Sequence, residues 1–489
     1  MARGTARIIL MLFVGALGCV LPARPQDHPM PAPPAQPPSS ASPTSSIIGM
    51  ENEAISWLQG LLRINTTNPP GNELNAAKYL AAILDREGIH AEIFESTPGR
   101  GFLVARLSSS AVPDPSRALL LMGHLDVVGV DRSKWKVEPF SGIIQGSYLY
   151  GRGAIDDKGM VASNLAVFIA LKRSGARLNR DVIFFAEGDE EAGGAAGMTF
   201  AVEKHWDKIA AGFALNEGGR VFEQNGKVQY VGVQASEKVM VNVDVIATGT
   251  SGHASVPLKD NPVTHLADAI SKISTFEAPI QFNSVTRAYF DGLAPIEDEE
   301  TGKWIRALQS SDRAEHAARF ISDANPTWDA MLRDTITPTI LQAGIRPNVV
   351  PSEARGIINV RLLPGNMIDA LVAKLQKLVN DPQVRLEVEP GGGEAAPSSS
   401  LSSDLYASIT RVVGKDFPSA PVLPYMSTGA TDSTPLRMRA VQAYGLLPFP
   451  MTQDDLSRIH GDNERIQLDN FRKGLEFLND VVVDFVVAK

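Results

Sequence analysis

The stretch ALLLMGHLDVV, residues 118–128, indicates how this chain folds. Five apolar residues precede its histidine, His124, and similar apolar runs precede two glutamates further along, Glu191 and Glu217. Short apolar runs between turn residues are typical of strands in a sheet that is covered on both faces. Because ligands of open α/β sheets bind outside the carboxyl ends of the strands, we expect these three side chains to meet at one sheet edge.

Two imidazoles and three carboxylates are the candidate metal ligands: His124, Asp156, Glu191, Glu217 and His460. Five ligands are too many for one tetrahedral zinc ion, and they suit two divalent ions that share a bridging carboxylate and a water. Each residue also has a structural alternative, because a histidine after a buried strand is commonly a core residue and Asp and Gly clusters are commonly turns. Three candidates at one edge favour the metal site, which is the machinery of a hydrolase.

The motifs around these residues resemble those of the M20 family of co-catalytic zinc metallopeptidases, which includes glutamate carboxypeptidases, aminoacylases and carboxypeptidase-S-type enzymes. The resemblance runs from Ile47 to the C-terminus. It implies two zinc ions, or other divalent metals, each held by one pair of residues: His124 with Glu217, and Glu191 with His460. It also implies that Asp156 bridges both metals, because the family pattern Asp-any-Lys selects Asp156 rather than Asp157.

The same resemblance implies two catalytic roles. Glu190 matches the general base of the family, and Asp126 matches the carboxylate beside the first ligand. Two metals lower the pKa of a shared water from about 15.7 towards 7. Glu190 would take the proton of this water and deliver it to the leaving nitrogen, while Asp126 would fix the ring orientation of His124.

Four residues outside the metal set match positions near the substrate: His253, Asn348, Arg361 and Thr431. By resemblance, His253 would help to stabilise the tetrahedral oxyanion, and Asn348 and Arg361 would bind the substrate carboxylate, which suits a guanidinium. The alternatives are that Arg361 pairs with a lid carboxylate and that Asn348 caps a turn. Thr431 lies in the sequence GATD, where Ala430 replaces a family glycine and narrows the space beside the scissile bond.

Strand and helix patterns alternate along the chain and predict an α/β fold, which the resemblance makes a zinc-exopeptidase-like catalytic sandwich. The catalytic domain is expected in two parts, residues 47–235 and 391–489. Between them, residues 236–390 follow the order strand, helix, strand, helix, strand, which predicts an inserted ferredoxin-like α+β module. The resemblance makes this module a lid and dimerisation domain, and hence implies a homodimer. Residues 276–342 form a longer polar insert without an assigned role.

The N-terminus predicts export. In residues 1–23, two arginines precede the apolar stretch Ile8–Val14, which is too short for a mature membrane span and is typical of a signal peptide. The sequence GALG before Cys19, the only cysteine, resembles a bacterial lipobox and predicts a lipid anchor, while plain signal cleavage stays open. Residues 24–46 are a Pro/Ser-rich tether that cannot bury a core. The mature protein is thus expected to be periplasmic, a membrane-anchored lipoprotein or secreted.

The predicted function is a dinuclear zinc hydrolase that cleaves a peptide or N-acyl amide bond next to a residue with a free carboxylate. A carboxypeptidase or dipeptidase acting on short peptides is the first hypothesis. The alternatives are an aminoacylase, a deacetylase or desuccinylase-type deacylase, and, in another class, a non-catalytic binding protein. The net charge of -9 gives no footprint for nucleic acid, and neither a G-x-S-x-G elbow nor an H-E-x-x-H motif is present.

Overall fold

The computed structural model describes residues 47–110, 112–310, 312–390 and 395–488. The predicted signal segment, the tether and Cys19 lie outside these ranges. None of the helices in the described ranges has the length and apolarity needed to cross a membrane.

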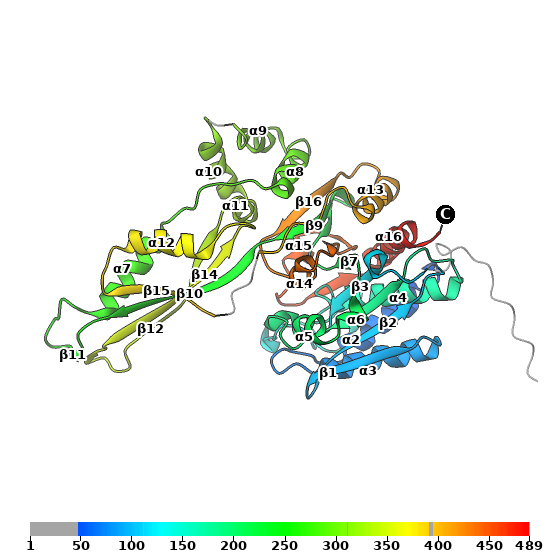
Figure 1. The fold of residues 1–489 in the computed structure, drawn as a ribbon, viewed down its shortest axis with the longest axis horizontal. Coiled ribbons are helices and arrows are strands. Elements are labelled where there is room, and N and C mark those ends of the chain that lie inside the picture. Colours follow the sequence, from blue (N-terminus) through cyan, green and yellow to red (C-terminus); the bar gives the residue numbers. More distant parts are fainter. Residues whose placement is uncertain (1–46, 111, 311, 391–394, 489) are drawn as a thin grey trace, which may run out of the picture. The chain divides into compact units, whose positions relative to one another are not determined.

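A ten-stranded sheet forms the centre of the catalytic part (Figure 1). Strands β3, β6, β7 and β17 run parallel to one another in its middle, and β16 (Val422–Ser427) pairs with β9 beside the main path. The strands of the main path are, in spatial order, β1 (Ala91–Thr97), β2 (Arg100–Leu107), β6 (Val182–Glu187), β3 (Leu119–His124), β7 (Phe213–Asn216), β17 (Gln442–Gly445), β9 (Lys227–Glu237), β8 (Arg220–Gln224) and β18 (Pro450–Met451).

Both faces of this sheet are covered, which explains why its central strands are apolar without interruption. Along β3, Leu119 and Leu121 belong to the core on one face, whereas Leu120 and Met122 belong to the core on the other. The first core includes helices α2 (Glu51–Leu62), α3 (Glu73–Arg86), α4 (Lys158–Ser174), α13 (Asp404–Asp416) and α16 (Leu468–Val486). The second includes α5 (Met198–Lys204), α6 (Trp206–Ile209) and α14 (Ser433–Met438). The predicted α/β fold is confirmed.

The inserted module has a four-stranded antiparallel sheet in the order β12-β14-β10-β15. Helices α7 (Pro262–Ser274) and α12 (Ile368–Val379) pack on one face of it and complete a separate apolar core. The strands are β10 (Val239–Thr248), β12 (Thr335–Ala343), β14 (Glu353–Leu362) and β15 (Val384–Val388). Strand β12 was not expected from the sequence, because most of its side chains are exposed and Pro338 interrupts any alternation.

The polar insert contains four helices that pack away from the core of this module. Their apolar residues Val285, Tyr289 and Phe290 are buried in the first catalytic core. The Tyr289 ring lies 5.9 Å from the ring of Tyr425 in β16. The insert therefore packs on the large sheet rather than on the sheet of the inserted module. The helices are α8 (Ser284–Leu293), α9 (Glu299–Ala307), α10 (Ala314–Ala324) and α11 (Pro326–Leu332).

Short elements complete the described chain. A three-stranded sheet joins β4 (Ile143–Gln145), β5 (Tyr148–Tyr150) and β19 (Arg465–Gln467), and thus brings the loops on either side of it together. A two-stranded sheet pairs β11 (Gly252–His253) with β13 (Val349–Val350). The remaining helical turns are η1 (Pro115–Arg117), η2 (Arg132–Lys134), η3 (Glu190–Ala192) and α15 (Gln453–Leu456).

Candidate metal centre

The carboxyl ends of the parallel strands deliver three of the predicted ligands. His124 is the last residue of β3 and pairs in register with Glu187, the last residue of β6. The turn η3, which carries Glu191, follows β6, and Glu217 directly follows β7. The topology therefore places these side chains at the same edge of the sheet, as the apolar runs indicate.

Asp156 lies between the two predicted histidine ligands. Its Oδ1 atom is 2.9 Å from Nε2 of His124, and its Oδ2 atom is 3.0 Å from Nε2 of His460. The same His460 nitrogen lies 3.1 Å from Oε2 of Glu191. One carboxylate thus offers one oxygen to each imidazole, which is the arrangement that a bridging ligand requires. His460, with 53% of its side chain exposed, is on the open side of the cluster.

The donor atoms also group in two sets of metal-binding size. Within each set all ligand atoms lie within 4.8 Å of one another: His124 with Asp156 and Glu191, and His124 with Glu190 and Glu217. Imidazole and carboxylate donors without cysteine suit a catalytic divalent metal. The residues present therefore fit a candidate metal site.

The buried carboxylates of the cluster repel one another, which favours the binding of a cation. Burial, reinforced by the neighbouring carboxylates Glu190 and Asp156, raises the pKa of Glu217 well above its usual value. Burial likewise raises the pKa of Glu190. For Asp156, burial acts in the same direction but is outweighed by hydrogen bonds from the two histidines, and the pKa is lowered. A divalent ion would relieve the repulsion among these carboxylates.

Asp126 connects the first histidine to the turn that carries the glutamates. Its Oδ1 atom lies 3.4 Å from Nδ1 of His124 and accepts a hydrogen bond from the backbone N–H of Glu190 at 3.2 Å. Its Oδ2 atom accepts from the backbone N–H of Glu191 at 3.1 Å and from Nδ2 of Asn68 at 2.8 Å. Asp126 is fully buried, so it can hold both parts of the site in one orientation.

The turn before Glu190 is held in an unusual conformation. Asp189 has a φ of 72°, a left-handed value that a non-glycine residue rarely adopts. Its carboxylate accepts hydrogen bonds from Arg100 Nη2 at 2.6 Å, Asn68 Nδ2 at 3.0 Å and the backbone N–H of Ala196 at 2.7 Å. These contacts fix the turn that presents Glu190.

Asp157 has a structural position rather than a place in the cluster. It is fully buried, and its Oδ2 atom accepts a hydrogen bond from the backbone N–H of His124 at 3.3 Å. A Cβ atom on Gly123 would lie 2.4 Å from this oxygen, which explains the glycine in the GHLD motif. The assignment of Asp156 rather than Asp157 as the bridging residue stays a prediction.

Sequence reasoning missed the buried pair Glu464 and Arg152. The Glu464 carboxylate accepts hydrogen bonds from the backbone N–H groups of Gly153, Ile155 and Asp156 at 2.9, 2.8 and 3.1 Å. It also accepts from Arg152 Nη1 at 2.7 Å, and Arg152 Nη2 donates to the backbone oxygen of His460 at 3.3 Å. The pair therefore joins the loops of Asp156 and His460. The feature of the sequence that could have revealed this pair is Glu464 itself, the acidic residue that ends the IHGDNE motif.

A second buried pair, Glu187 and Asp432, lies near the general-base candidate Glu190. Burial raises the pKa of Glu187 well above its usual value, and the neighbouring Asp432 adds to the shift. Burial raises the pKa of Asp432 itself to about 7, against the hydrogen bond with Glu187. Burial thus opposes the charged form of both carboxyl groups.

The predicted substrate residues of the lid are not members of the grouped metal-binding residues. In the described part of the chain, no hydrogen bond or ion pair joins His253, Asn348 or Arg361 to the cluster. His253 Nδ1 lies 2.7 Å from Ser255 Oγ, and the backbone oxygen of Asn348 accepts from Ala254. Arg361 Nε donates to Asn359 at 3.0 Å, so the proposed pairing of Arg361 with a lid carboxylate is not seen.

The fourth substrate candidate, Thr431, lies closer to the centre. Its hydroxyl donates to Glu237 Oε2 at 2.7 Å, and it lines a cavity together with Glu190. The roles of all four substrate candidates stay predictions.

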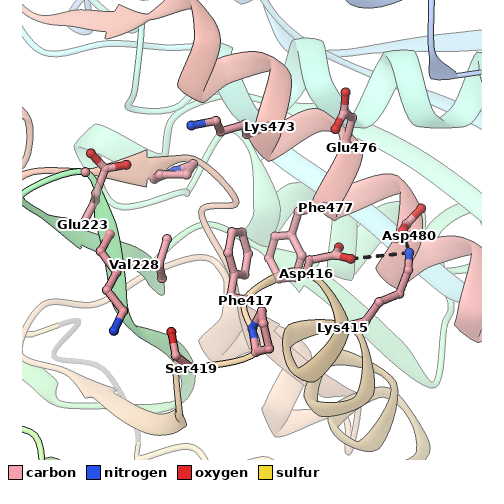
Figure 2. Close-up of a pocket in the computed structure, with 14 residues that line it drawn as sticks. Glu223, Val228, Lys415, Asp416, Phe417, Ser419, Lys473, Glu476, Phe477 and Asp480 are labelled. Carbon is pink, nitrogen blue, oxygen red and sulfur yellow. Dashed lines mark hydrogen bonds and ion pairs between the residues drawn. The ribbon is translucent and has the colours of Figure 1, made fainter.

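A separate cleft of about 600 Å³ contains none of the predicted residues (Figure 2). Phe417 and Phe477 meet at a centroid distance of 5.2 Å on its wall, and Lys415 pairs with Asp416 and Asp480. None of its lining residues belongs to the metal cluster.

Comparison with known proteins places this site in a family. Residues 120–484 match the family described as Peptidase family M20/M25/M40. This chain belongs to the M20 peptidase family. It is therefore a hydrolytic enzyme that acts on C–N bonds, which confirms the predicted family and sets aside a non-catalytic binding protein.

Individual M20 proteins resemble the chain over most of its length. A probable carboxypeptidase S-like 2 from Dictyostelium discoideum is 31% identical over 372 residues, 74% of this chain and 70% of that protein. The human N-fatty-acyl-amino acid synthase/hydrolase is 30% identical over 383 residues, 76% of this chain and 74% of that protein. The structure of an M20 metallo-carboxypeptidase from Sulfolobus solfataricus has a TM-score of 0.67 at 21% identity, with 88% and 99% of the two chains covered. This structural likeness confirms the fold.

Proposed function

We propose that this M20 hydrolase holds two zinc ions and cleaves an amide bond on the amino side of a residue with a free carboxylate. The observation that carries the proposal is Asp156, whose two oxygens face His124 and His460 at 2.9 and 3.0 Å. Zinc, when bound, would supply an acidified water and a polarised substrate carbonyl. Glu217 and Glu191 would complete the two ligand sets.

The residues of the chain would move the proton. Glu190 is next to a ligand, and burial raises its pKa. A raised pKa makes the carboxylate a stronger base, which suits a group that takes a proton and returns it to the leaving nitrogen. Asp126 would keep His124 and the Glu190 turn in register through the hydrogen bonds described above. His253 would aid the oxyanion, and Asn348 and Arg361 would bind the substrate carboxylate, which requires the lid to approach the cluster.

Short peptides are the first proposed substrates, in agreement with the name of the Dictyostelium relative. N-acyl amino acids are the second, and the name of the human relative favours them. Both substrate classes share an amide bond beside a residue with a free carboxylate. The sequence motifs do not distinguish these two substrate classes, because the metal site would act on the amide bond that both classes contain.

The test uses residues 47–489, loaded with zinc and freed of it by a chelator. We expect about two zinc ions per chain, with cleavage of dipeptides or N-acyl amino acids that is lost with the chelator and restored by zinc. Substrates with an amidated carboxyl terminus are the matched control and should be poor. A folded protein that binds no metal, or that cleaves amidated and free substrates equally, would contradict the proposal.

We also propose export, lipidation at Cys19 and dimerisation through the lid, all of which rest on the sequence alone. Expression of the full chain with Cys19→Ala tests the anchor: the variant should leave the membrane fraction, and an unchanged distribution would contradict lipidation. Sedimentation of residues 47–489 tests the dimer, which a monomer at all concentrations would contradict.

A further inference from the structure

His265, in helix α7 of the inserted module, lies between two carboxylates. Its Nδ1 atom is 2.6 Å from Oδ2 of Asp381, and its Nε2 atom is 3.3 Å from Oδ1 of Asp260. Asp260 precedes α7, whereas Asp381 lies in the turn between α12 and β15. Only 22% of the His265 side chain is exposed, so the ring joins two segments of the module through a largely buried contact.

Asp260 closes the loop that carries His253. Its backbone oxygen accepts a hydrogen bond from the backbone N–H of Thr250 at 3.2 Å, and its Oδ2 atom accepts from the Thr250 hydroxyl at 2.7 Å. A Cβ atom on Gly249 would lie 2.9 Å from Oδ1 of Asp260, so this carboxylate packs against the start of the loop. Residues 250–260, the His253 loop, therefore have joined ends and include strand β11 (Figure 1).

Asp381 is held in place at the other nitrogen of the ring. Its Oδ1 atom accepts a hydrogen bond from the backbone N–H of Gln383 at 2.9 Å. Burial opposes the charge of Asp381, but the hydrogen bonds from Gln383 and His265 outweigh it and lower the pKa of Asp381. The Thr250 hydroxyl and the contact with His265 lower the pKa of Asp260 as well. Both neighbours of the imidazole are therefore ionised at neutral pH.

In the described chain, no other charged group forms an ion pair with this ring. Lys272, on the same helix, helps to lower the pKa of Asp381. The sheet and α12 turn apolar side chains towards α7 in their shared core. The other charged residues of these elements are exposed or project from the opposite face of the sheet. They are Asp268 of α7, Asp369, Lys374 and Lys377 of α12, and Asp244, Glu353, Arg355, Arg361, Arg385 and Glu387 of the strands.

We propose that His265, in its charged form, is a positioning residue that holds the His253 loop in the conformation that catalysis requires. The inference rests on the proposed function, in which His253 stabilises the oxyanion. Carboxylates only accept hydrogen bonds, and an imidazole carries an N–H on both nitrogens only when it is protonated. A neutral His265 can therefore donate to one carboxylate alone. The contact with Asp260 is the longer one, so deprotonation should break this contact and release the end of the loop.

Hydrogen exchange tests the loop without the need for activity. A histidine usually changes its charge between about pH 5 and pH 8. Protection of the backbone N–H groups of residues 250–260, corrected for intrinsic exchange rates, should therefore fall several-fold in the wild type from about pH 5.5 to about pH 8. His265→Gln should show the low protection at both pH values.

His316→Gln is the matched control for the loss of a histidine. His316 lies in helix α10, its ring contacts Trp304, and it forms no ion pair in the described chain. This variant should keep the pH dependence of the wild type. Equal protection of the His253 loop at both pH values in the wild type would overturn the proposal, and so would loss of the pH dependence in His316→Gln.

Catalysis provides a second readout, because His265 would act only through His253. In the zinc-loaded enzyme, His265→Gln should lower kcat about tenfold at pH ~6 and change KM little, since complete loss of an oxyanion donor costs about 10²–10³-fold. This loss should shrink as pH rises towards about 8, where a histidine has usually lost its proton. In a His253→Ala background, the same substitution should have no further effect. An unchanged kcat, a loss that is equal at all pH values, or a loss that persists in the His253→Ala background would contradict the positioning role.

The two readouts distinguish this inference from the proposed function. If protection of the His253 loop falls with pH but neither peptides nor N-acyl amino acids are cleaved, the effect of His265 on the loop stands and the proposed function fails. If zinc-dependent cleavage is present but neither the protection nor the effect of His265→Gln on kcat depends on pH, the proposed function stands and the role of His265 fails.

Discussion

Replacement of Glu464 by glutamine should weaken zinc binding although Glu464 is not a proposed ligand. Its carboxylate accepts three backbone N–H groups around Asp156 and the guanidinium of Arg152. Glutamine has the same shape but turns one acceptor into a donor that would face other donors. It also leaves the Arg152 charge, only 2% exposed, without its partner. Loss of one partner of a buried ion pair costs about 3–5 kcal/mol.

This cost falls on the two loops that carry Asp156 and His460, so metal affinity should drop together with stability. Residues that orient metal ligands change metal affinity by about 10–100-fold when they are replaced. Competition with a chromogenic chelator measures the zinc affinity, and denaturant unfolding of the metal-free protein measures the stability. Asp462→Asn is the matched control, because Asp462 is an exposed acid in the same loop. Wild-type zinc affinity in a folded Glu464→Gln variant would refute the positioning role.

Four further predictions concern the site and the lid. Glu190→Ala should bind zinc normally but lose about 10²–10⁴-fold in kcat, and near-normal kcat in the metallated variant would contradict its role as base. Hydrogen bonds to Asp156 and Glu191 raise the pKa of His460 to about 10. Zinc binding at pH 7 should therefore release protons, and zinc affinity should increase as pH rises. Calorimetry in buffers of different protonation enthalpy checks this, and a binding enthalpy that does not depend on the buffer would contradict it. Burial raises the pKa of Asp432 from 3.8 to about 7, so the folded state binds the Asp432 proton more tightly than the unfolded state does. The free energy of unfolding of the wild type should therefore fall as pH rises from about 4 to about 7. Asp432→Asn should reduce this fall in unfolding experiments on the metal-free protein, and the same pH dependence in both proteins would argue against it. A mixture of Glu190→Ala and His253→Ala proteins should recover activity if His253 acts on the neighbouring subunit, and the absence of recovery would argue against a shared site.

The sequence predicted the fold well because its signals are local. The apolar run before His124 alternates between two cores, and only a sheet covered on both faces needs such a run. The same strands bring His124, Glu191 and Glu217 to one edge, since parallel strands end together. These inferences needed no knowledge of side-chain contacts, and the M20 resemblance added the assignment of the metals.

Features that depend on distant contacts could not be predicted in the same way. Strand β12 is an edge strand with exposed side chains, so it lacks the alternation that identifies a strand. The composition of residues 276–342 predicts a polar insert, but buried residues of the insert such as Tyr289 pack on β16. Strand β16 is distant in the sequence, so this contact leaves no local pattern. Glu464 was an ordinary acidic residue in a loop until the structure placed it under the backbone of Asp156.

The electrostatics of the centre indicate why these buried residues are tolerated. Local rules of folding disfavour several carboxylates at one buried sheet edge, and real proteins break such rules mainly at functional sites. The raised pKa values of Glu190 and Glu217 show that burial and mutual repulsion oppose their charged forms. The scaffold counters this strain with fixed donors, such as the backbone N–H groups that hold Asp126 and Glu464. A bound cation would reduce the repulsion among the carboxylates that the fold holds close together. Relief of this repulsion would contribute to the metal affinity.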